Sequence, residues 1–229
     1  MSRDSRSSNA RKKESSLHRS LKFRYSGGGA TETPVGDYVC DGLGDDGEYI
    51  EVQTGSFGPL KEKVKFLTKS GKVRIIHPII SQKSIELYDS GGSLLRKRKS
   101  PAKGSAWDVF KVLLYAPELP LLKNLVIELA IVDVTERRTD DGRGSWRRRG
   151  ISITDRVISG WRESIVLSKP KDYHQFIPFR KSERFSVRDL AEKAGIDVGL
   201  ARKALNVLNK MGLVERTGKQ GRAYQYRKI

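Results

Sequence analysis

Apolar residues recur with two different periods in the middle of the chain. Leu60, Val64 and Leu67 lie at helical spacing and predict a helix that ends at Gly71. The mostly apolar run that follows, residues 73–80, is typical of a central strand. A helix directly followed by a buried strand favours an α/β fold.

Further runs extend this pattern on both sides. A helix is expected from Leu17 up to the glycines at 27–29. Residues 84–97 predict a hairpin around the turn sequence DSGG. Residues 107–115 predict an amphipathic helix, and residues 125–134 a long buried strand.

Between the first helix and the central strand, residues 32–53 predict another hairpin. A short apolar strand, residues 38–40, leads into Asp41. Glycine and aspartate at 44–47 then reverse the chain, and residues 49–53 return as the second strand.

The second strand of this hairpin segregates its polar side chains. A two-residue period puts Glu51 and Gln53 on one face and the aliphatic Ile50 and Val52 on the other. Since Asp41 precedes the turn by only a few residues, its carboxylate is expected beside that of Glu51. Two neighbouring carboxylates repel each other unless a cation lies between them, and oxygen ligands suit Mg²⁺ or Mn²⁺. The alternative is an ordinary hairpin whose polar residues face solvent.

The order of these residues resembles the core of the PD-(D/E)XK nucleases, which include many restriction endonucleases and the archaeal Holliday-junction resolvases. That pattern has an Asp at the start of one strand and (Asp/Glu)-x-Lys on the next, often with an earlier helical Glu. Asp41 matches the Asp, Glu51 the second acid, and Gln53 the Lys position, where Gln departs from the pattern. Glu32 matches the earlier acid, and Asp37 is a rival for the first Asp.

This resemblance covers roughly residues 17 to 80 and implies a restriction-endonuclease-like mixed sheet flanked by helices. It implies a deoxyribonuclease that depends on Mg²⁺ or Mn²⁺, with Asp41 and Glu51 as metal ligands and with Glu32 and Gln53 in the catalytic set. Lys61, Lys63 or Lys65 takes the place of the motif lysine that Gln53 replaces, or these three lysines form a solvated helix face. The rival hypothesis is a non-catalytic DNA-binding regulator or architectural protein with a degenerate nuclease fold. The whole chain also resembles an uncharacterised prokaryotic family that joins such a core to a C-terminal winged helix.

The C-terminal segment predicts two helices and a hairpin. Ser186 and Asp189 form a capping box at the start of the first helix, and Asp197 caps the second. Apolar residues line one face of the second helix, which Gly212 ends: Leu200, Ala204, Leu208 and Met211. Strands at 213–216 and 223–226 flank the tip sequence GKQG.

This segment resembles the winged helix-turn-helix of bacterial regulators over roughly residues 180 to 229. The resemblance implies that the helix at 198–211 enters the major groove of DNA, with Arg202 and Lys203 exposed. It also implies that Lys219 and Arg222 contact phosphates. Winged helices that bind other proteins are the alternative, and the basic tip favours DNA.

The net charge of the chain also favours a nucleic-acid partner. The chain has 45 Lys and Arg against 27 Asp and Glu, a formal net charge of +18, which favours a polyanion. Two basic segments are candidate DNA contacts, although each also fits a solvated charge run or, for the tryptophan, an anchor to the core. Their residues are Arg96, Arg98, Lys99 and Lys103 in the first, and Trp146, Arg147, Arg148 and Arg149 in the second.

The rest of the composition sets the expected organisation. A basic tail at 1–16, a nuclease-like domain at 17–172 and a winged helix at 173–229 are expected, and the tail is expected to be disordered. A lone cysteine, Cys40, fits a reducing cytoplasm, where a DNA-binding protein associates with the nucleoid. The chain has no apolar stretch of membrane-spanning length, so no membrane partner is expected. The sequence leaves open whether the chain acts alone or as a homodimer.

Overall fold

The central sheet is built on β5 (Val73–Tyr88) and β7 (Leu125–Asp140), each 16 residues long and paired in parallel. The computed structural model describes residues 14–28 and 32–229. Shorter strands flank the central pair in the order β3-β4-β5-β7-β8, with β6 paired to β5 and β9 to β7. They are β3 (Gly42–Leu43), β4 (Tyr49–Val52), β6 (Leu94–Lys99), β8 (Ile151–Trp161) and β9 (Ile165–Leu167). The result is a mixed sheet, because β4, β5 and β7 are parallel and the others antiparallel to their neighbours.

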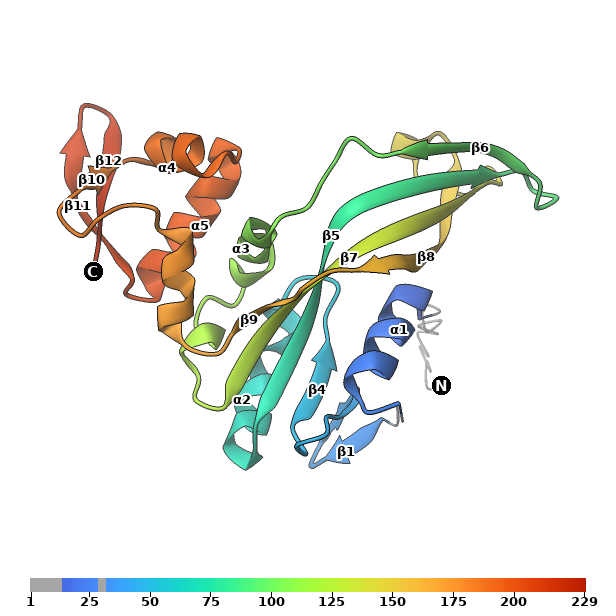
Figure 1. The fold of residues 1–229 in the computed structure, drawn as a ribbon, viewed down its shortest axis with the longest axis horizontal. Coiled ribbons are helices and arrows are strands. Elements are labelled where there is room, and N and C mark those ends of the chain that lie inside the picture. Colours follow the sequence, from blue (N-terminus) through green and yellow to red (C-terminus); the bar gives the residue numbers. More distant parts are fainter. Residues whose placement is uncertain (1–13, 29–31) are drawn as a thin grey trace, which may run out of the picture.

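Helices cover both faces of the lower half of this sheet (Figure 1). Leu17 and Leu21 of α1 (Ser16–Tyr25) pack on one face in a cluster with Ile50, Val52 and Ile76. The opposite face carries α2 (Lys61–Ser70) and α3 (Val109–Leu113), whose buried side chains join the larger core. Alternate residues of β4 and β5 therefore enter different cores, as a two-residue period requires.

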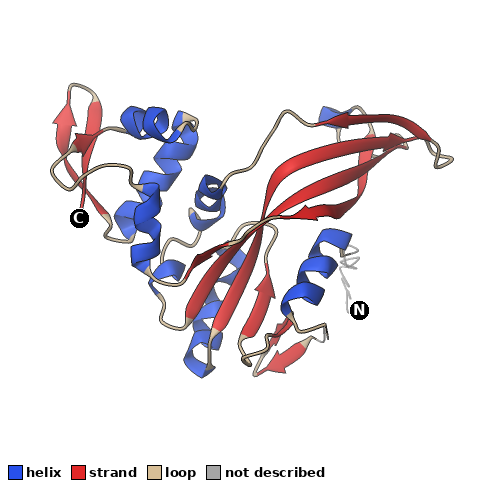
Figure 2. Ribbon diagram, viewed as in Figure 1, coloured by secondary structure: helices blue, strands red, loops and turns tan. Residues whose placement is uncertain are grey.

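Beyond the last β4–β5 pair, Val52 with Ile76, the long strands continue, at first with α1 packed against β8, and then project away from the helices of the core (Figure 2). Here β6, β5, β7 and β8 form a four-stranded extension, hereafter the arm. Residues 77–88 of β5 span about 40 Å at ~3.3 Å per residue. A register shift between Ile80 and Gln82 marks its base. The arm thus projects basic side chains well beyond the hairpin that holds Asp41.

A buried carboxylate ties the strands of the arm together. The side chain of Glu136 on β7 is 1% exposed. It accepts hydrogen bonds from Arg138 at 2.6 and 2.9 Å and from Arg156 of β8 at 2.9 Å, and Lys83 of β5 lies 3.8 Å away. Burial alone would raise the pKa of Glu136, but the two arginines outweigh it and the net pKa lies below its usual value.

The C-terminal part forms its own small sheet, in the order β10-β12-β11, against two helices. Its elements are β10 (Arg184–Phe185), α4 (Val187–Ala194), α5 (Val198–Lys210), β11 (Val214–Gln220) and β12 (Ala223–Lys228). We call residues 180–229 the C-terminal unit. Its apolar residues belong to the same cluster as the core beside α3, so the unit packs on the core through α5.

Many predicted elements are confirmed. The predicted capping box at Ser186, the Asp197 cap and the buried Leu200–Leu208 face are all present. The predicted helix end at Gly212 has a positive φ of 72°, and Gly195, which ends α4, has a positive φ of 64°. Short 3₁₀ helices complete the structure: η1 (Gly58–Leu60), η2 (Ala106–Asp108), η3 (Leu119–Leu121), η4 (Trp146–Arg148) and η5 (Pro170–Phe176). No helix of the described residues has both the length and the apolar character needed to cross a membrane.

Some predictions need correction. The strand β2 (Tyr38–Cys40) pairs with β1 (Thr33–Val35), so β3, not β2, forms the hairpin with β4. The predicted end of the central strand at residue 80 is wrong, because β5 continues into the arm. The tail boundary at 16 is too late, since Ser15 caps α1; the rest of the predicted tail, residues 1–13, and the glycine at 29 lie outside the described residues.

Replacement of Glu136 by Gln tests the buried charge network of the arm. The variant is expected to lose about 2 kcal/mol of unfolding free energy at neutral pH, because two arginines lose their charged acceptor. Since the folded pKa of Glu136 is lowered, this stabilisation is present at neutral pH and fades as the pH falls below about 4. Urea unfolding at several pH values measures it.

The control is Glu215→Gln, which removes an exposed ion pair with Arg227. Exposed pairs contribute less than about 1 kcal/mol. Equal losses in the two variants, or a Glu136→Gln loss that does not change with pH, would contradict the role given to Glu136.

Candidate active site and nucleic-acid interface

Asp41 lies between β2 and β3, at the edge of β4. Its Oδ2 accepts a hydrogen bond from the Val52 amide at 2.8 Å and lies 3.5 Å from His18 Nε2, while Oδ1 lies 3.3 Å from Lys22 Nζ. Burial raises the pKa of Asp41, but the nearby His18, the hydrogen bond from the Val52 amide and the Lys22 charge outweigh it, so the net pKa is lowered. Asp41 is therefore a carboxylate at neutral pH.

Glu51 is the more deeply buried acid. The residue is 3% exposed, and its Oε1 contacts the ammonium group of Lys63 on α2. Lys63 also donates a hydrogen bond to the carbonyl oxygen of Val39 on β2 at 2.6 Å, which fixes the position of the lysine. Burial raises the pKa of Glu51; Lys63 offsets part of that rise, and the nearby Asp41 charge adds to it. The two carboxylates are therefore close enough for the charge of Asp41 to act on Glu51.

A buried ammonium group lies on the α1 side of this pair. Lys22 is 7% exposed, and its Nζ lies 3.3 Å from Asp41, 3.6 Å from Glu14 and 3.8 Å from Glu32. Burial would lower the pKa of Lys22, but these three acids raise it overall. Glu32 therefore reaches the cluster through Lys22, with its own side chain 73% exposed.

The two carboxylates already have counter-ions from opposite faces of the sheet, Lys22 from α1 and Lys63 from α2. Within the described residues, no three His, Cys, Asp or Glu side chains converge as metal ligands. A divalent ion at Asp41 and Glu51 would share these carboxylates with Lys22 and Lys63. The chemistry of the site is that of two acid–lysine pairs.

Gln53 and Asp37 take other places. The side-chain amide of Gln53 donates a hydrogen bond to the Ser56 carbonyl oxygen at 2.6 Å. The backbone carbonyl oxygen of Gln53 lies 2.6 Å from Nδ1 of the buried His77. Asp37 is exposed in the turn between β1 and β2. Asp41, and not Asp37, is therefore the acid that accompanies Glu51. The ammonium group that contacts Glu51 is that of Lys63, whereas the nuclease pattern has its lysine at the position of Gln53.

The first basic segment lies mostly on the second strand of the predicted hairpin, which extends to Lys99. Arg96, Lys97, Arg98 and Lys99 are all exposed on β6, whose alternation sends Arg96 and Arg98 to one face and the lysines to the other. Lys97 pairs with Glu86 at 2.9 Å. Lys103 follows beside Gly104, whose amide donates to the Ile80 carbonyl oxygen at 2.8 Å and where a Cβ would come within 2.6 Å of that oxygen. Glycine there permits close packing on β5.

The second basic segment joins β7 to β8 at the opposite edge of the arm. Trp146 is 83% exposed, so the alternative that it anchors the loop to the core is wrong. The guanidinium group of Arg147 lies 5.4 Å from the Trp146 ring. Arg148 donates to the Ile151 carbonyl oxygen, and Arg149 has a positive φ of 50°. Because β5 and β7 separate β6 from β8, the two basic segments lie on different edges of one sheet.

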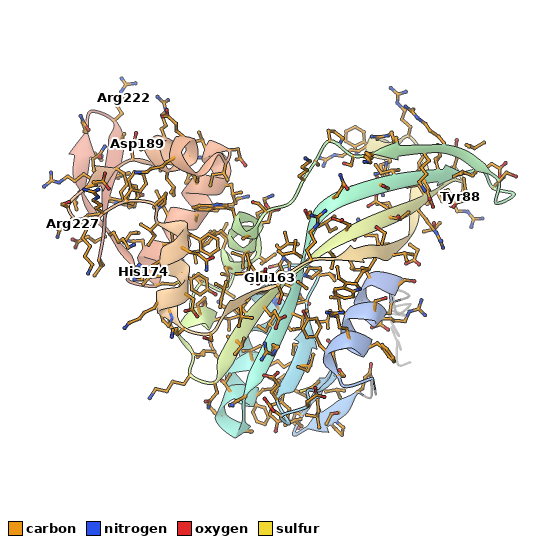
Figure 3. All side chains as sticks on the ribbon, in the orientation of Figure 1. Tyr88, Glu163, His174, Asp189, Arg222 and Arg227 are labelled. Carbon is orange, nitrogen blue, oxygen red and sulfur yellow. The ribbon has the colours of Figure 1, made fainter. Side chains whose placement is uncertain are left out.

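The C-terminal unit gathers its predicted contact residues at one end. A depression of about 450 Å³ is lined by Arg188, Arg202, Arg222 and Tyr224, from both helices and the hairpin. Lys203 is half-buried beside Arg202, and Lys219 lies 4.8 Å from the ring of Tyr224. Figure 3 labels Arg222 at the outer end of the hairpin and Tyr88 near the far end of the arm, on opposite sides of the molecule.

Several functional candidates escaped the sequence analysis. Lys22 and His18 were unremarkable positions on a predicted amphipathic helix, although their i, i+4 spacing placed them on one face. Trp161, on the exposed end of β8, carried no local signal besides its type. Arg24 lies 4.4 Å over the Trp161 ring.

Comparisons with known proteins place the chain in a family. A family model described as "Domain of unknown function (DUF8091)" matches residues 15–168. The chain belongs to this family. An uncharacterized protein of Treponema pallidum (strain Nichols) is 29% identical over 217 residues, which cover 94% of this chain and 86% of that protein. No solved structure matches the chain. The DUF8091 match spans the core and the arm, and the similarity to the Treponema protein extends into the C-terminal unit.

Replacement of Lys63 by Met tests the acid–lysine pair. Glu51 is then left buried without a counter-ion, which is expected to cost about 3 kcal/mol of unfolding free energy at pH 7. A carboxyl with a raised folded pKa binds its proton more tightly in the folded state, so the loss is expected to shrink toward about pH 5. Denaturant unfolding at both pH values measures this.

The matched control is Lys65→Met on the same helix, whose partner Glu62 is exposed; its unfolding free energy is expected to match that of the wild type. The double variant Glu51→Gln with Lys63→Met is expected to recover most of the loss, because no buried charge remains. A double variant less stable than Lys63→Met alone would refute the pairing.

Proposed function

We propose that the protein binds DNA and that its C-terminal unit is a winged helix-turn-helix that engages the duplex. The single observation that supports this most directly is the exposed cationic end of the C-terminal unit, formed by Arg202 of α5, Arg188 of α4 and Arg222 of the hairpin. The element order strand, helix, helix, strand, strand, with β12 central in its sheet, agrees with that fold.

The exposed side of α5 has the size and chemistry of a recognition surface. Its apolar residues are buried against α4 and the core, while Arg202 and Asn206 remain exposed one helical turn apart. Arginine and asparagine donate to base edges in the major groove. Lys219 and Arg222 on the hairpin lie beyond the helix, where phosphate contacts fix the register of a bound duplex.

The basic surfaces of the arm extend this interface away from the C-terminal unit. Charges spaced along about 40 Å of strand match the length of roughly one turn of a DNA duplex. In this proposal the protein is a DNA-binding protein with a nuclease-like core, and the core serves first as a rigid connection between the C-terminal unit and the arm.

Hydrolysis of DNA phosphodiesters is the second candidate function. The observation that favours it is the Asp41, Glu51 and Lys63 cluster, in which Lys63 supplies the ammonium group that Gln53 lacks. A Mg²⁺ or Mn²⁺ ion would supply charge stabilisation and an activated water in such a nuclease. The residues of this chain hold two acids beside one another, and a lysine neutralises each of them.

Loss of hairpin charge tests duplex binding. The double variant Lys219→Ala with Arg222→Ala is expected to weaken binding alike for unrelated duplex sequences and to reduce the salt slope by about 1 to 2, since two phosphate contacts disappear. Fluorescence anisotropy of a labelled duplex, over a range of KCl concentrations, measures both.

The control for that experiment is Lys69→Ala with Lys123→Ala, which removes the same charge from an exposed surface beside α2. The control is expected to keep the wild-type salt slope. Equal losses in the two double variants would mean that net charge, and not the hairpin, determines binding.

A cleavage assay separates the two candidate functions. If the core is catalytic, wild-type protein cuts plasmid in the presence of Mg²⁺ or Mn²⁺, and Glu51→Gln removes the cleavage while duplex binding persists. Lys63→Arg, which keeps the positive charge, is expected to keep part of that activity. Absence of cleavage of duplex, branched and single-stranded DNA by wild-type protein would leave DNA binding alone as the function.

A further inference from the structure

The outer face of α1 forms a groove with β8 that shares Arg148 with the predicted interfaces. Helix α1 turns His18 and Lys22 toward Asp41, so its opposite face is free to line another surface. Two adjoining depressions lie along that face and share Arg19. We call them together the α1–β8 groove.

One end of the groove is aromatic. A depression of about 500 Å³ is lined by Arg19, Ser20, Phe23, Arg24 and Trp161. Phe23 is 63% exposed and Trp161 38% exposed, so two large rings face solvent within one depression. The guanidinium group of Arg24 lies 4.4 Å over the Trp161 ring. Aromatic rings and guanidinium planes of this kind stack with unpaired bases.

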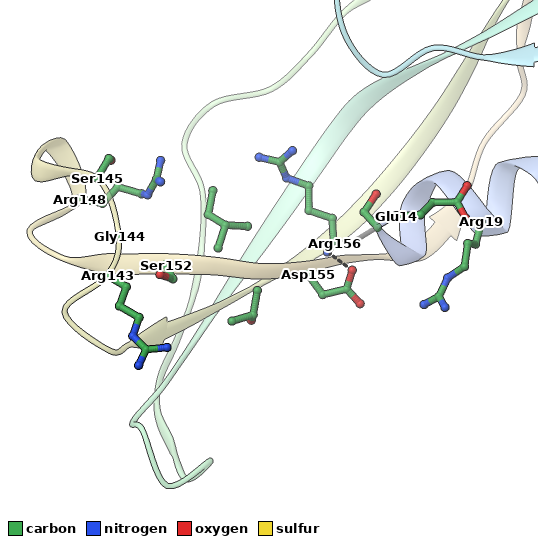
Figure 4. Close-up of a pocket in the computed structure, with 12 residues that line it drawn as sticks. Glu14, Arg19, Arg143, Gly144, Ser145, Arg148, Ser152, Asp155 and Arg156 are labelled. Carbon is green, nitrogen blue, oxygen red and sulfur yellow. Dashed lines mark hydrogen bonds between the residues drawn. The ribbon is translucent and has the colours of Figure 1, made fainter. Parts of the chain in front are cut away.

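The other end of the groove is rich in arginine. A depression of about 650 Å³ is lined by arginines 19, 143, 148 and 156, with Glu14 and Asp155 as the acids. Figure 4 shows Arg19 and Glu14 at the α1 end and Arg143 and Arg148 at the loop end, with Asp155 and Arg156 between them.

Asp155, the acid on β8, already accepts hydrogen bonds from α1. Asp155 accepts hydrogen bonds from the Ser16 amide at 2.9 Å and the Ser16 hydroxyl at 2.5 Å, so it serves to cap α1 against β8. Arg19 and Arg143 are exposed, which leaves their guanidinium groups open to phosphate oxygens. Both depressions fall within the volume range of nucleotide-sized ligands.

We propose that the α1–β8 groove binds a single-stranded segment of DNA, with bases stacked at Phe23 and Trp161 and phosphates at Arg19 and Arg143. A paired duplex hides the faces of its bases, so exposed rings in a basic groove favour unpaired strands. The proposal extends the proposed DNA binding, but it requires neither cleavage nor the C-terminal unit.

Tryptophan fluorescence of the full chain tests this groove. In a Trp107→Phe and Trp146→Phe background, Trp161 is the one remaining tryptophan of the three in the sequence. Stacking of a base is expected to quench its emission when oligothymidylate is added. In the otherwise wild-type chain, Phe23→Ala with Trp161→Ala is expected to weaken oligothymidylate binding by about ten-fold or more, the effect of losing one or two stacked bases.

Controls separate this site from the duplex interface and from misfolding. Tyr115→Ala removes another exposed ring, 61% exposed and outside the groove, and is expected to leave oligothymidylate binding unchanged. Trp161→Phe keeps an aromatic ring and is expected to retain most of the affinity. Duplex binding by the Phe23 and Trp161 double variant is expected to match wild type, so failure of the groove is distinguishable from failure of the proposed duplex interface.

Three results would overturn the proposal. One is an unquenched Trp161 at saturating oligothymidylate, and another is an equal loss of binding in the Tyr115→Ala control. Tighter binding of oligouridylate than of oligothymidylate would overturn the assignment to DNA, because the exposed rings would then serve RNA.

Discussion

Parallel pairing of β5 with β7 is the constraint on which the rest of the structure depends. The pairing runs from Val73 with Leu125 to Tyr88 with Thr139, so both strands cross the core and continue through the arm. In the lower half, alternate residues of these strands enter separate cores under α1 and α2. In the upper half, Val132 and Val134 of β7 still belong to the α1 cluster, and farther out polar side chains replace the apolar ones. One pair of strands therefore connects a packed core to an exposed basic sheet, and fixes the distance between them.

The acids at the edge of β4 follow from the same arrangement. Helices on both faces of the sheet bury Asp41 and Glu51, and a buried carboxylate without a partner costs several kcal/mol. Lys22 and Lys63 reach these acids from the two helices and remove that cost. Burial raises the pKa of Glu51, Lys63 offsets part of that rise and the Asp41 charge adds to it, so the cluster is sensitive to any loss of a lysine. Each of the two acids thus has a lysine as its counter-ion, one from each helix.

Much of the fold could be predicted from local pattern, and the partners of individual strands and charges could not. Helical spacing located α2 and α5, and capping residues such as Ser186 and Asp197 located helix starts to the residue. The short strand at Tyr38–Cys40 was placed correctly but paired wrongly, because three residues carry no information about which edge they join. The end of β5 was missed because polar residues after Ile80 normally mark a loop, whereas in the arm they are half-buried on a strand between β6 and β7. Proximity of Asp41 and Glu51 was predictable from a turn, but Lys22 and Lys63 lie on helices whose packing only the tertiary structure defines.

The proposed DNA binding requires that DNA contacts the C-terminal unit. Amide hydrogen exchange tests that contact most directly. The full chain is compared with and without a duplex that carries a single-stranded extension. Exchange is predicted to slow in α5 and in the β11–β12 hairpin, and along α1 and β8, while amides of α2 on the far face of the sheet are unchanged. Unchanged exchange in α5 and the hairpin at saturating DNA would contradict the account, whatever happens elsewhere in the chain.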